Sequence, residues 1–175
     1  MDDLTRVNKL IMKSKTNLKN IKKIIILIDG SAASMKAARF GISLSKKFRS
    51  DLIGLTVIDL MSLPYGYFLT QPGTSSHDDI LKRKKREAKK WLDEVENSVL
   101  EIQNEDGPNR IRFRSEILED PFSKVENTIL NYAETENVDL IVMGTRGGSG
   151  LKMTLRGSVA SGVLSYSRCP VMIVR

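Results

Sequence analysis

Glycine is concentrated in one stretch of the chain, Gly144-Thr145-Arg146-Gly147-Gly148-Ser149-Gly150, which holds four glycines in seven residues. Residues without a Cβ leave their backbone N–H groups accessible and adopt the positive φ angles that let successive amides converge on an anion. Ten residues beyond Gly147, Gly157 and Ser158 open a helical pattern, whose N-terminal amides and hydroxyl can complete such a site. The composition and spacing predict a loop that binds phosphate.

Two better-known phosphate motifs do not occur in the sequence. The P-loop requires a Gly-Lys pair, and the chain has none. The dinucleotide fingerprint G-x-G-x-x-G should follow the first strand, where the chain reads Gly30-Ser31-Ala32-Ala33-Ser34-Met35 instead. The pattern that remains is G-x2-G-x9-G-S, formed by Gly144, Gly147, Gly157 and Ser158.

Strands must position such a loop, and the chain alternates strand-like with helix-like segments. Buried or alternating apolar runs predict strands at 23–29, 51–58, 110–117, 138–144 and 170–174. Apolar residues at helical spacing predict helices at 32–49, 78–103, 121–136, with Pro121 in the first turn, and 158–167. This order predicts one α/β domain with a parallel sheet and right-handed crossovers.

Ligands of such sheets bind beyond the carboxyl ends of the strands, at the switch point where the strand order reverses. The first predicted strand ends in Ile28-Asp29-Gly30-Ser31, the second in Val57-Ile58-Asp59, and the fourth runs into the glycine cluster. We therefore expect these three strand ends to share one site.

Charge is unevenly distributed along the chain. Of the net charge of +7 in 175 residues, residues 1–23 contribute seven basic and two acidic side chains, which leaves 21 basic against 19 acidic groups in the rest. A nearly balanced body argues against a nucleic-acid-binding domain. The basic run 82–90 has two interpretations, a nucleic-acid or localisation patch and a solvated helix face, and the acidic residues that follow it favour the solvated face.

One cysteine, Cys169, and one histidine, His77, exclude an intramolecular disulfide and clusters of Cys and His that hold a metal. A lone cysteine predicts a reducing compartment, which we expect to be the cytoplasm. The sequence shows neither an apolar run long enough to span a membrane nor a signal-type segment at its beginning.

Four motifs together resemble the universal stress protein family over about residues 22–175. They are Ile28-Asp29-Gly30-Ser31, Val57-Ile58-Asp59, the G-x2-G-x9-G-S stretch and the terminal Cys169-Pro170-Val171-Met172-Ile173-Val174. The resemblance implies a doubly wound, Rossmann-like sheet of five parallel strands in the order 3-2-1-4-5. It also implies binding of ATP, ADP or AMP by a homodimer that acts as a stress sensor or regulator.

The resemblance also implies roles for individual residues. Asp29 would contact the ribose or a Mg²⁺ bound to the phosphates, and Val57 would meet the adenine through its backbone. Met143 and Gly144 would line adenine and ribose, and the glycine loop with Ser158 and Val159 would hold the phosphates. The expected binding residues are Ile28, Asp29, Gly30, Ser31, Val57, Met143, Gly144, Arg146, Gly147, Gly157, Ser158 and Val159, with Asp29 as the metal ligand.

The chain departs from the family pattern at two places. Gly148 stands where a basic residue is frequent, and the proline often found just before the first-strand aspartate is absent. A missing cation leaves a triphosphate less neutralised, so ADP or AMP is an alternative to ATP. Arg146, with Lys152 or Arg156, could compensate.

Each assignment has a structural alternative. Asp29 and Ser158 could cap helices, and Val57 and Met143 could pack in the core without a ligand. Neither a Ser/His/Asp triad nor a carboxylate pair faces the glycine loop, so we expect at most slow hydrolysis. A flavin or dinucleotide domain is a weaker alternative.

The sequence also predicts a division of the chain and an interface. Residues 1–21 form a basic extension with apolar residues at helical spacing. This pattern favours a helix docked on its own dimer, or a partly disordered tail, over a segment that binds an acidic membrane surface or an acidic partner. Residues 22–175 form the domain. The family's strand order places 171–174 at a sheet edge, where it could pair with a second copy. A dimeric interaction module without nucleotide is therefore the alternative function.

Overall fold

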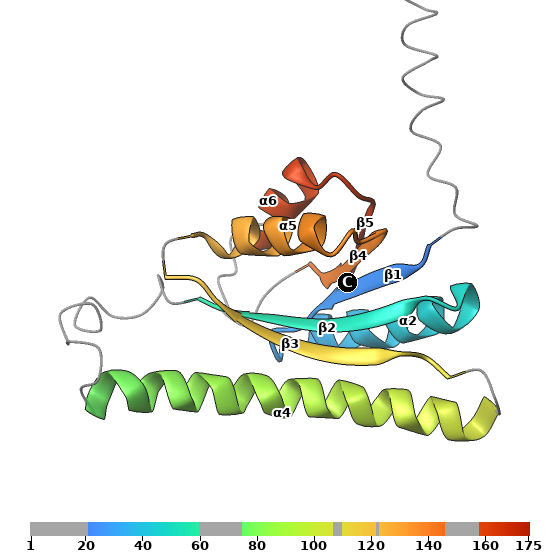
Figure 1. Ribbon diagram of the computed structural model, residues 1–175, viewed down its shortest axis with the longest axis horizontal. Helices are drawn as coiled ribbons and strands as arrows, with labels where there is room; N and C mark the ends of the chain where they lie inside the picture. Colours follow the sequence, from blue (N-terminus) through green and yellow to red (C-terminus); the bar gives the residue numbers. More distant parts are fainter. Residues whose placement is uncertain (1–20, 60–74, 107–109, 122, 146–157) are drawn as a thin grey trace, which may run out of the picture.

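Five parallel strands form the sheet, in the order β3-β2-β1-β4-β5 (Figure 1). The computed structural model describes residues 21–59, 75–106, 110–121, 123–145 and 158–175. Its strands are β1 (Lys23–Leu27), β2 (Asp51–Ile58), β3 (Phe113–Glu119), β4 (Leu140–Gly144) and β5 (Val171–Val174), and its helices are α2 (Ala32–Phe48), α4 (Ser75–Asp106), α5 (Val125–Thr135) and α6 (Ser158–Tyr166). The predicted doubly wound sheet and its 3-2-1-4-5 order are confirmed.

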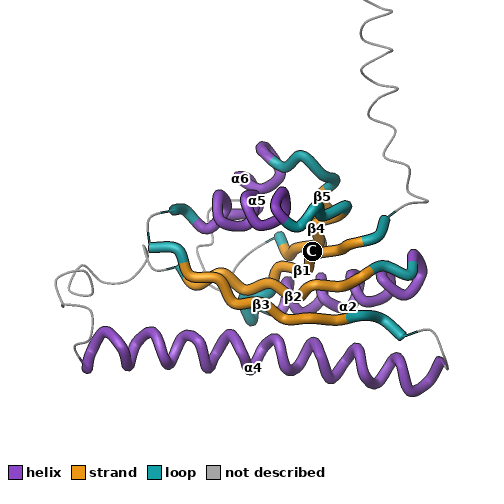
Figure 2. Tube along the Cα trace, viewed as in Figure 1, coloured by secondary structure: helices purple, strands orange, loops and turns teal. Residues whose placement is uncertain are grey.

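Helices cover both faces of the sheet: α2 and α4 lie on one side and α5 and α6 on the other (Figure 2). The central strand β1 serves both layers because successive side chains point to opposite faces. Ile24 and Ile26 belong to the core beneath α2 and α4, whereas Ile25 and Leu27 belong to the core beneath α5 and α6. This two-sided burial explains the unbroken apolar run in the sequence.

The first strand ends at Leu27, two residues earlier than predicted. The Ile28 amide still donates to the Leu55 carbonyl at 2.9 Å, but the Asp29 amide turns away from the sheet toward the Ser34 hydroxyl. Asp29 therefore lies in the turn that enters α2, and it does not belong to the strand.

Helix α5 begins at Val125, so the prediction that Pro121 lies in its first turn is wrong. The Ser123 amide donates to Asp120 Oδ1 at 3.1 Å, which forms a turn ahead of the helix. Lys124 then takes the extended conformation of an N-cap residue. Pro121 lies exposed within this turn.

Three other elements differ from the prediction by two residues or more at one or both ends. Strand β3 is displaced from 110–117 to Phe113–Glu119, because it follows β2 as far as the pair Ile58 and Glu119. Strand β4 begins at Leu140 and not at 138, since the Val138 amide donates to the end of α5 at Ala133. Helix α4 is longer at both ends than the predicted 78–103.

Parts of the predicted organisation lie outside the described residues. They include residues 1–20 of the predicted extension, and Arg146, Gly147, Gly148, Lys152, Arg156 and Gly157. Ile21, the last residue of that extension, is 5% exposed and belongs to the core beneath α2 and α4. Among the described helices, none is both long and apolar enough to cross a membrane.

Candidate functional site

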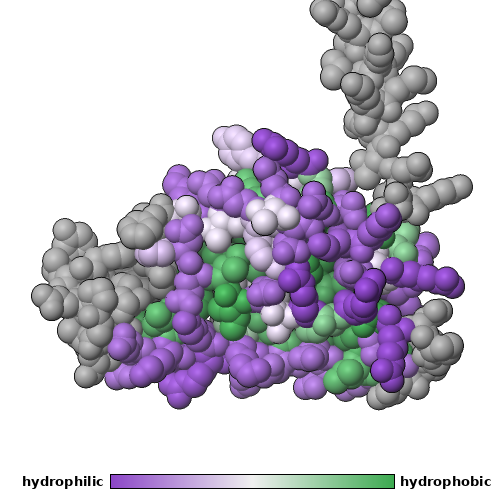
Figure 3. Space-filling view, in the orientation of Figure 1, coloured by the Kyte–Doolittle hydropathy of each residue, from purple (hydrophilic) through white to green (hydrophobic). Residues whose placement is uncertain are grey.

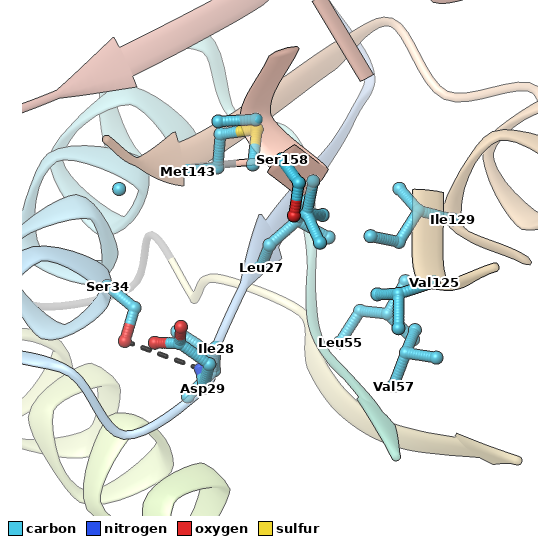
Figure 4. Close-up of a pocket in the computed structure, with 13 residues that line it drawn as sticks. Leu27, Ile28, Asp29, Ser34, Leu55, Val57, Val125, Ile129, Met143 and Ser158 are labelled. Carbon is cyan, nitrogen blue, oxygen red and sulfur yellow. Dashed lines mark hydrogen bonds between the residues drawn. The ribbon is translucent and has the colours of Figure 1, made fainter. Parts of the chain in front are cut away.

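A pocket opens at the carboxyl ends of β1, β2 and β4, between α2 on one side and α5 and α6 on the other (Figure 4). Its empty space, including the open mouth, is about 680 Å³. Its described lining consists of Leu27, Ile28, Asp29, Ser34, Leu55, Val57, Val125, Ile129, Met143, Gly144, Ser158, Val159 and Ala160. The pocket lies at the switch point, since β1 pairs with β2 on one side and β4 on the other.

The fold brings most of the expected residues together at this pocket. Those that line it are Ile28, Asp29, Val57, Met143, Gly144, Ser158 and Val159. Gly30 and Ser31 are described but are not part of the lining. Arg146, Gly147 and Gly157 lie outside the described residues, so their part in the site stays a prediction.

The lining is divided into a polar and an apolar side. Figure 4 shows Asp29 and Ser34 together at one side, with the apolar side chains of Leu55, Val57, Val125 and Ile129 gathered at the other. Asp29 carries the only charge among the described lining residues. Such a surface suits a ligand with a flat apolar part joined to a polar one.

The polar side is held by the turn between β1 and α2. Asp29 Oδ1 accepts a hydrogen bond from the Ser31 amide at 3.0 Å, and the Ser34 hydroxyl donates to the Ser31 carbonyl at 2.9 Å. Ser31 is the N-cap of α2, because its hydroxyl accepts from the Ser34 amide at 3.1 Å. Asp29 thus stands before the cap and does not cap the helix itself, and its carboxyl remains exposed beside the pocket.

Gly144 lets the end of β4 approach the first turn of α2. A Cβ added there would lie 2.8 Å from the Ala33 carbonyl carbon and 2.9 Å from the Ser34 amide nitrogen. A side chain would therefore push the helix away from the strand. This close approach places the polar start of α2 beside the pocket.

Helix α6 contributes the start of a second helix to the site. It begins at Ser158, which is exposed and whose hydroxyl points into the pocket in Figure 4. Val159 and Ala160 follow in the lining. The described residues thus place two helix starts, those of α2 and α6, at one pocket, an arrangement that favours negative charge.

Six lining residues were not predicted: Leu27, Ser34, Leu55, Val125, Ile129 and Ala160. The place of Leu55 in the lining could have been inferred from the sequence, because Leu55 stands two residues before Val57 and therefore points to the same face of the sheet. Ser34 carried a weaker signal, three residues after an N-cap serine. Val125 and Ile129 share one helix face, but their place depends on how α5 crosses the sheet, which the sequence does not reveal.

The described residues do not provide an obvious catalytic group. No group of three or more His, Cys, Asp or Glu that could hold a metal occurs among them. Cys169 precedes β5, at the amino end of the strands, with its Sγ 3.5 Å from Ser167 Oγ. Burial raises the pKa of the Cys169 thiol, so it is a poor nucleophile at neutral pH.

Comparison with known proteins identifies the relatives of this chain. A model described as the universal stress protein family matches residues 20–175. Universal stress protein MJ0531 of Methanocaldococcus jannaschii is 33% identical over 165 residues, which cover 94% of this chain and 87% of that relative.

Solved structures show the same fold. Universal stress protein UspA from Lactobacillus plantarum aligns with a TM-score of 0.69 at 22% identity, covering 89% of this chain and 99% of that one. A universal stress protein in complex with cAMP aligns at 0.62, with 20% identity over 88% and 97% of the two chains. A third, from Archaeoglobus fulgidus in complex with dAMP, aligns at 0.56, with 19% identity over 89% and 98%.

Proposed function

The chain belongs to the universal stress protein family, and from this premise we propose that it binds an adenine nucleotide in the pocket at the carboxyl ends of β1, β2 and β4. The observation that carries the proposal is the division of the pocket into an apolar side and a polar side beside two helix starts. The cAMP and dAMP complexes of two similar folds support it.

The apolar side receives the adenine. Val57 on β2 and Ile129 on α5 offer apolar contact to the base, and backbone groups at Val57 supply hydrogen bonds. Met143 and Gly144 then meet the ribose at the end of β4. Base recognition thus rests on shape and backbone groups and not on a charged side chain.

The polar side receives the ribose and phosphates. Asp29 accepts hydrogen bonds from the ribose hydroxyls, and Ser158 with the α6 amides meets the phosphates. Gly30 and Ser31 hold the turn that carries Asp29. Arg146, Gly147 and Gly157 complete the phosphate site from the loop that follows β4.

A Mg²⁺ ion fits this donor set only as a partner of the phosphates. Magnesium in nucleotide sites keeps most of its waters and uses one or two protein carboxylates. Asp29 is the one carboxylate among the described lining residues, so it would hold the ion together with phosphate oxygens. The ion would neutralise phosphate charge. Because the described lining holds no His and no carboxylate besides Asp29, we expect at most slow hydrolysis.

We further propose that the protein acts as a dimeric stress-response regulator in the cytoplasm. Strand β5 is an edge of the described sheet, and Met172 on it is 36% exposed. An edge strand offers unpaired backbone groups to a second copy. The same observation favours the second candidate, a dimeric interaction module without nucleotide.

The first experiment separates these two functions. Small molecules released on denaturing the purified protein are identified, and ATP, ADP and AMP are titrated calorimetrically with and without Mg²⁺. We expect a released adenine nucleotide or micromolar binding, with Mg²⁺ strengthening the binding of ATP more than that of AMP. A folded dimer that releases nothing and gives no binding heat would support the interaction module instead.

A further inference from the structure

Helix α4 presents a long charged face away from the sheet. Its opposite face packs on β2 and β3 through Ala88, Leu92, Val95 and Val99, which are at most 2% exposed. The outward face forms a shallow groove lined mainly by charged side chains (Arg86, Lys89, Lys90, Asp93, Glu94 and Glu101). Figure 3 shows hydrophilic side chains along the edge of the molecule where α4 lies.

The two signs of charge occupy different halves of this helix. Residues 82–90 contain seven basic side chains and one acidic one, whereas residues 93–106 contain six acidic side chains and no basic one. The change of sign falls between Lys90 and Asp93, near the middle of the 32-residue helix. The outward face therefore has a basic half and an acidic half of similar length.

Stability of the helix itself does not account for this segregation. Lys82, Arg86 and Lys90 follow one another at intervals of four residues, and like charges at this spacing destabilise a helix. The last turn contains no basic residue, although a basic residue there would interact favourably with the helix dipole. The arrangement thus costs the isolated subunit some stability.

Pairs within the subunit use only part of this charge. Lys89 Nζ meets Asp93 Oδ1 at 3.0 Å, and Lys85 Nζ meets Glu119 Oε1 at 2.6 Å. Ser98 Oγ donates to the Glu94 backbone carbonyl, but within the described part of the chain no hydrogen bond or ion pair joins the charged side-chain groups of Arg86, Lys90, Glu94 or Glu101 to another residue. These four charges are available to a partner.

We propose that two copies of the chain associate through α4 in antiparallel orientation, with the basic half of each against the acidic half of the other. A twofold axis level with Trp91 and Leu92 sets Lys90 opposite Asp93 of the second copy, and Lys82 opposite Glu101. A second copy supplies both signs in the required order, whereas an anionic polymer or membrane would match one half alone.

The expected association is weak and depends on salt. One helix pair buries less surface than a permanent interface, and exposed ion pairs are screened at moderate ionic strength. This distinguishes the α4 contact from edge pairing through β5, which rests on backbone hydrogen bonds. It also makes the contact independent of any nucleotide in the pocket.

Two charge-reversal variants of the full chain test the proposal. Arg86→Glu/Lys90→Glu makes the outward face mostly acidic, and Glu94→Lys/Glu101→Lys makes it mostly basic. Arg39→Glu/Lys47→Glu on α2 is the matched control, since it changes the same residue types on another exposed helix surface. Sedimentation velocity measures association at about 50 mM and about 500 mM NaCl, where screening differs strongly.

We expect the wild type and the α2 control to form at low salt a species of about twice the mass seen at high salt. Each α4 variant alone should lose this species, and an equimolar mixture of the two α4 variants should regain it, because their faces are then complementary. Circular dichroism confirms that each variant is folded.

Three results would overturn the proposal: a wild-type mass that does not change with salt, retention of the larger species by either α4 variant alone, or failure of the mixture to associate. A wild type that stays one size but binds anionic vesicles or nucleic acid through residues 82–90 would likewise overturn it and assign the basic half to that ligand.

Discussion

The indole of Trp91 on α4 lies directly against Gly30, the residue that follows Asp29 in the turn between β1 and α2. A Cβ added at Gly30 would be 2.2 Å from Trp91 Cε2, and the φ angle of Gly30 is 74°, where side chains are rarely accommodated. Two independent constraints therefore require glycine here. They fix the turn that presents Asp29 to the pocket.

This relationship predicts that Gly30→Ala lowers the free energy of unfolding by about 3 kcal/mol, from the left-handed backbone and from overlap with Trp91. In a Trp91→Leu background the overlap is relieved, and the same substitution should cost about 1 to 2 kcal/mol. Urea denaturation of the wild type, the two single variants and the double variant measures the coupling energy between Gly30 and Trp91. An equal cost in both backgrounds would show that the indole does not constrain the turn.

Gly144 and Gly162 provide a second comparison, because their surroundings differ in rigidity. A Cβ at Gly144 would meet the backbone of Ala33 at 2.8 Å, whereas a Cβ at Gly162 in α6 would meet Glu126 Cγ at 2.8 Å, a side-chain atom that can shift more readily than backbone. We expect Gly144→Ala to destabilise the fold by about 2 kcal/mol or more. Gly162→Ala should change stability by less than about 1 kcal/mol, since alanine favours a helix. Thermal unfolding compares the stability of the two variants. A Gly162→Ala variant less stable than Gly144→Ala would contradict the close packing of β4 against α2.

Much of the fold was predictable because strands buried on both faces carry unbroken apolar runs, as in 24–28 and 140–143. The sheet order came from the motifs shared with a family and not from these runs. Helix starts were less predictable. Pro121 fits the first turn of a helix and the turn before a helix equally well. The hydrogen bond from the Ser123 amide to Asp120 Oδ1 places it in the turn before the helix.

The site was predictable where it follows strand ends. Asp29, Val57 and Met143 each stand at or near the carboxyl end of a strand, so the switch-point rule brought them together. Val125 and Ile129 escaped prediction, because the angle at which α5 crosses the sheet is a property of packing. Residues at such crossings are found from the structure.

Ser34 is expected to stabilise the turn that carries Asp29. Its hydroxyl is buried, donates to the Ser31 carbonyl and lies 3.4 Å from the Asp29 amide. Ser34→Ala should lower the free energy of unfolding by about 1 to 2 kcal/mol, because the Ser31 carbonyl loses a donor and the Asp29 amide loses its acceptor. Nucleotide binding should weaken about fivefold, the equivalent of about 1 kcal/mol.

The matched control for this prediction is Ser43→Ala, on the exposed side of the same helix. Ser43 Oγ donates to the Arg39 carbonyl at 2.9 Å, so the same type of bond is removed far from the pocket. We expect a change within about 0.5 kcal/mol and unaltered nucleotide affinity. Equal effects of both substitutions on affinity would argue against a role for Ser34 in positioning Asp29.

Glu136 makes the stability of the fold depend on pH. A hydrogen bond from Lys23 Nζ, at 3.0 Å, lowers the pKa of the Glu136 carboxyl, and Arg114 lowers it further. A carboxyl with a lowered pKa in the folded state stabilises the fold above its unfolded pKa of about 4.3 and loses this contribution as the pH falls through the folded pKa.

We therefore expect Glu136→Gln to be less stable than the wild type at pH 7 by no more than about 1 kcal/mol, since the ion pair is partly exposed. The difference should shrink toward pH 3. Urea denaturation at pH 7, 5 and 3 measures it, and Lys23→Met should show the same trend. A difference that grows as the pH falls would contradict the assigned cause.

One matched pair of variants tests directly whether the apolar side of the pocket binds adenine. Val57 lines the pocket, whereas its register partner Leu118 on β3 is similarly half-buried on the same face but does not line it. Calorimetric titration of AMP and ATP into Val57→Glu and Leu118→Glu separates the effect of a charge in the pocket from that of a charge elsewhere on the same face of the sheet. We predict a loss of at least about tenfold in affinity for Val57→Glu, about 1.4 kcal/mol, and little change for Leu118→Glu. Equal affinities in the two folded variants would contradict binding at this pocket.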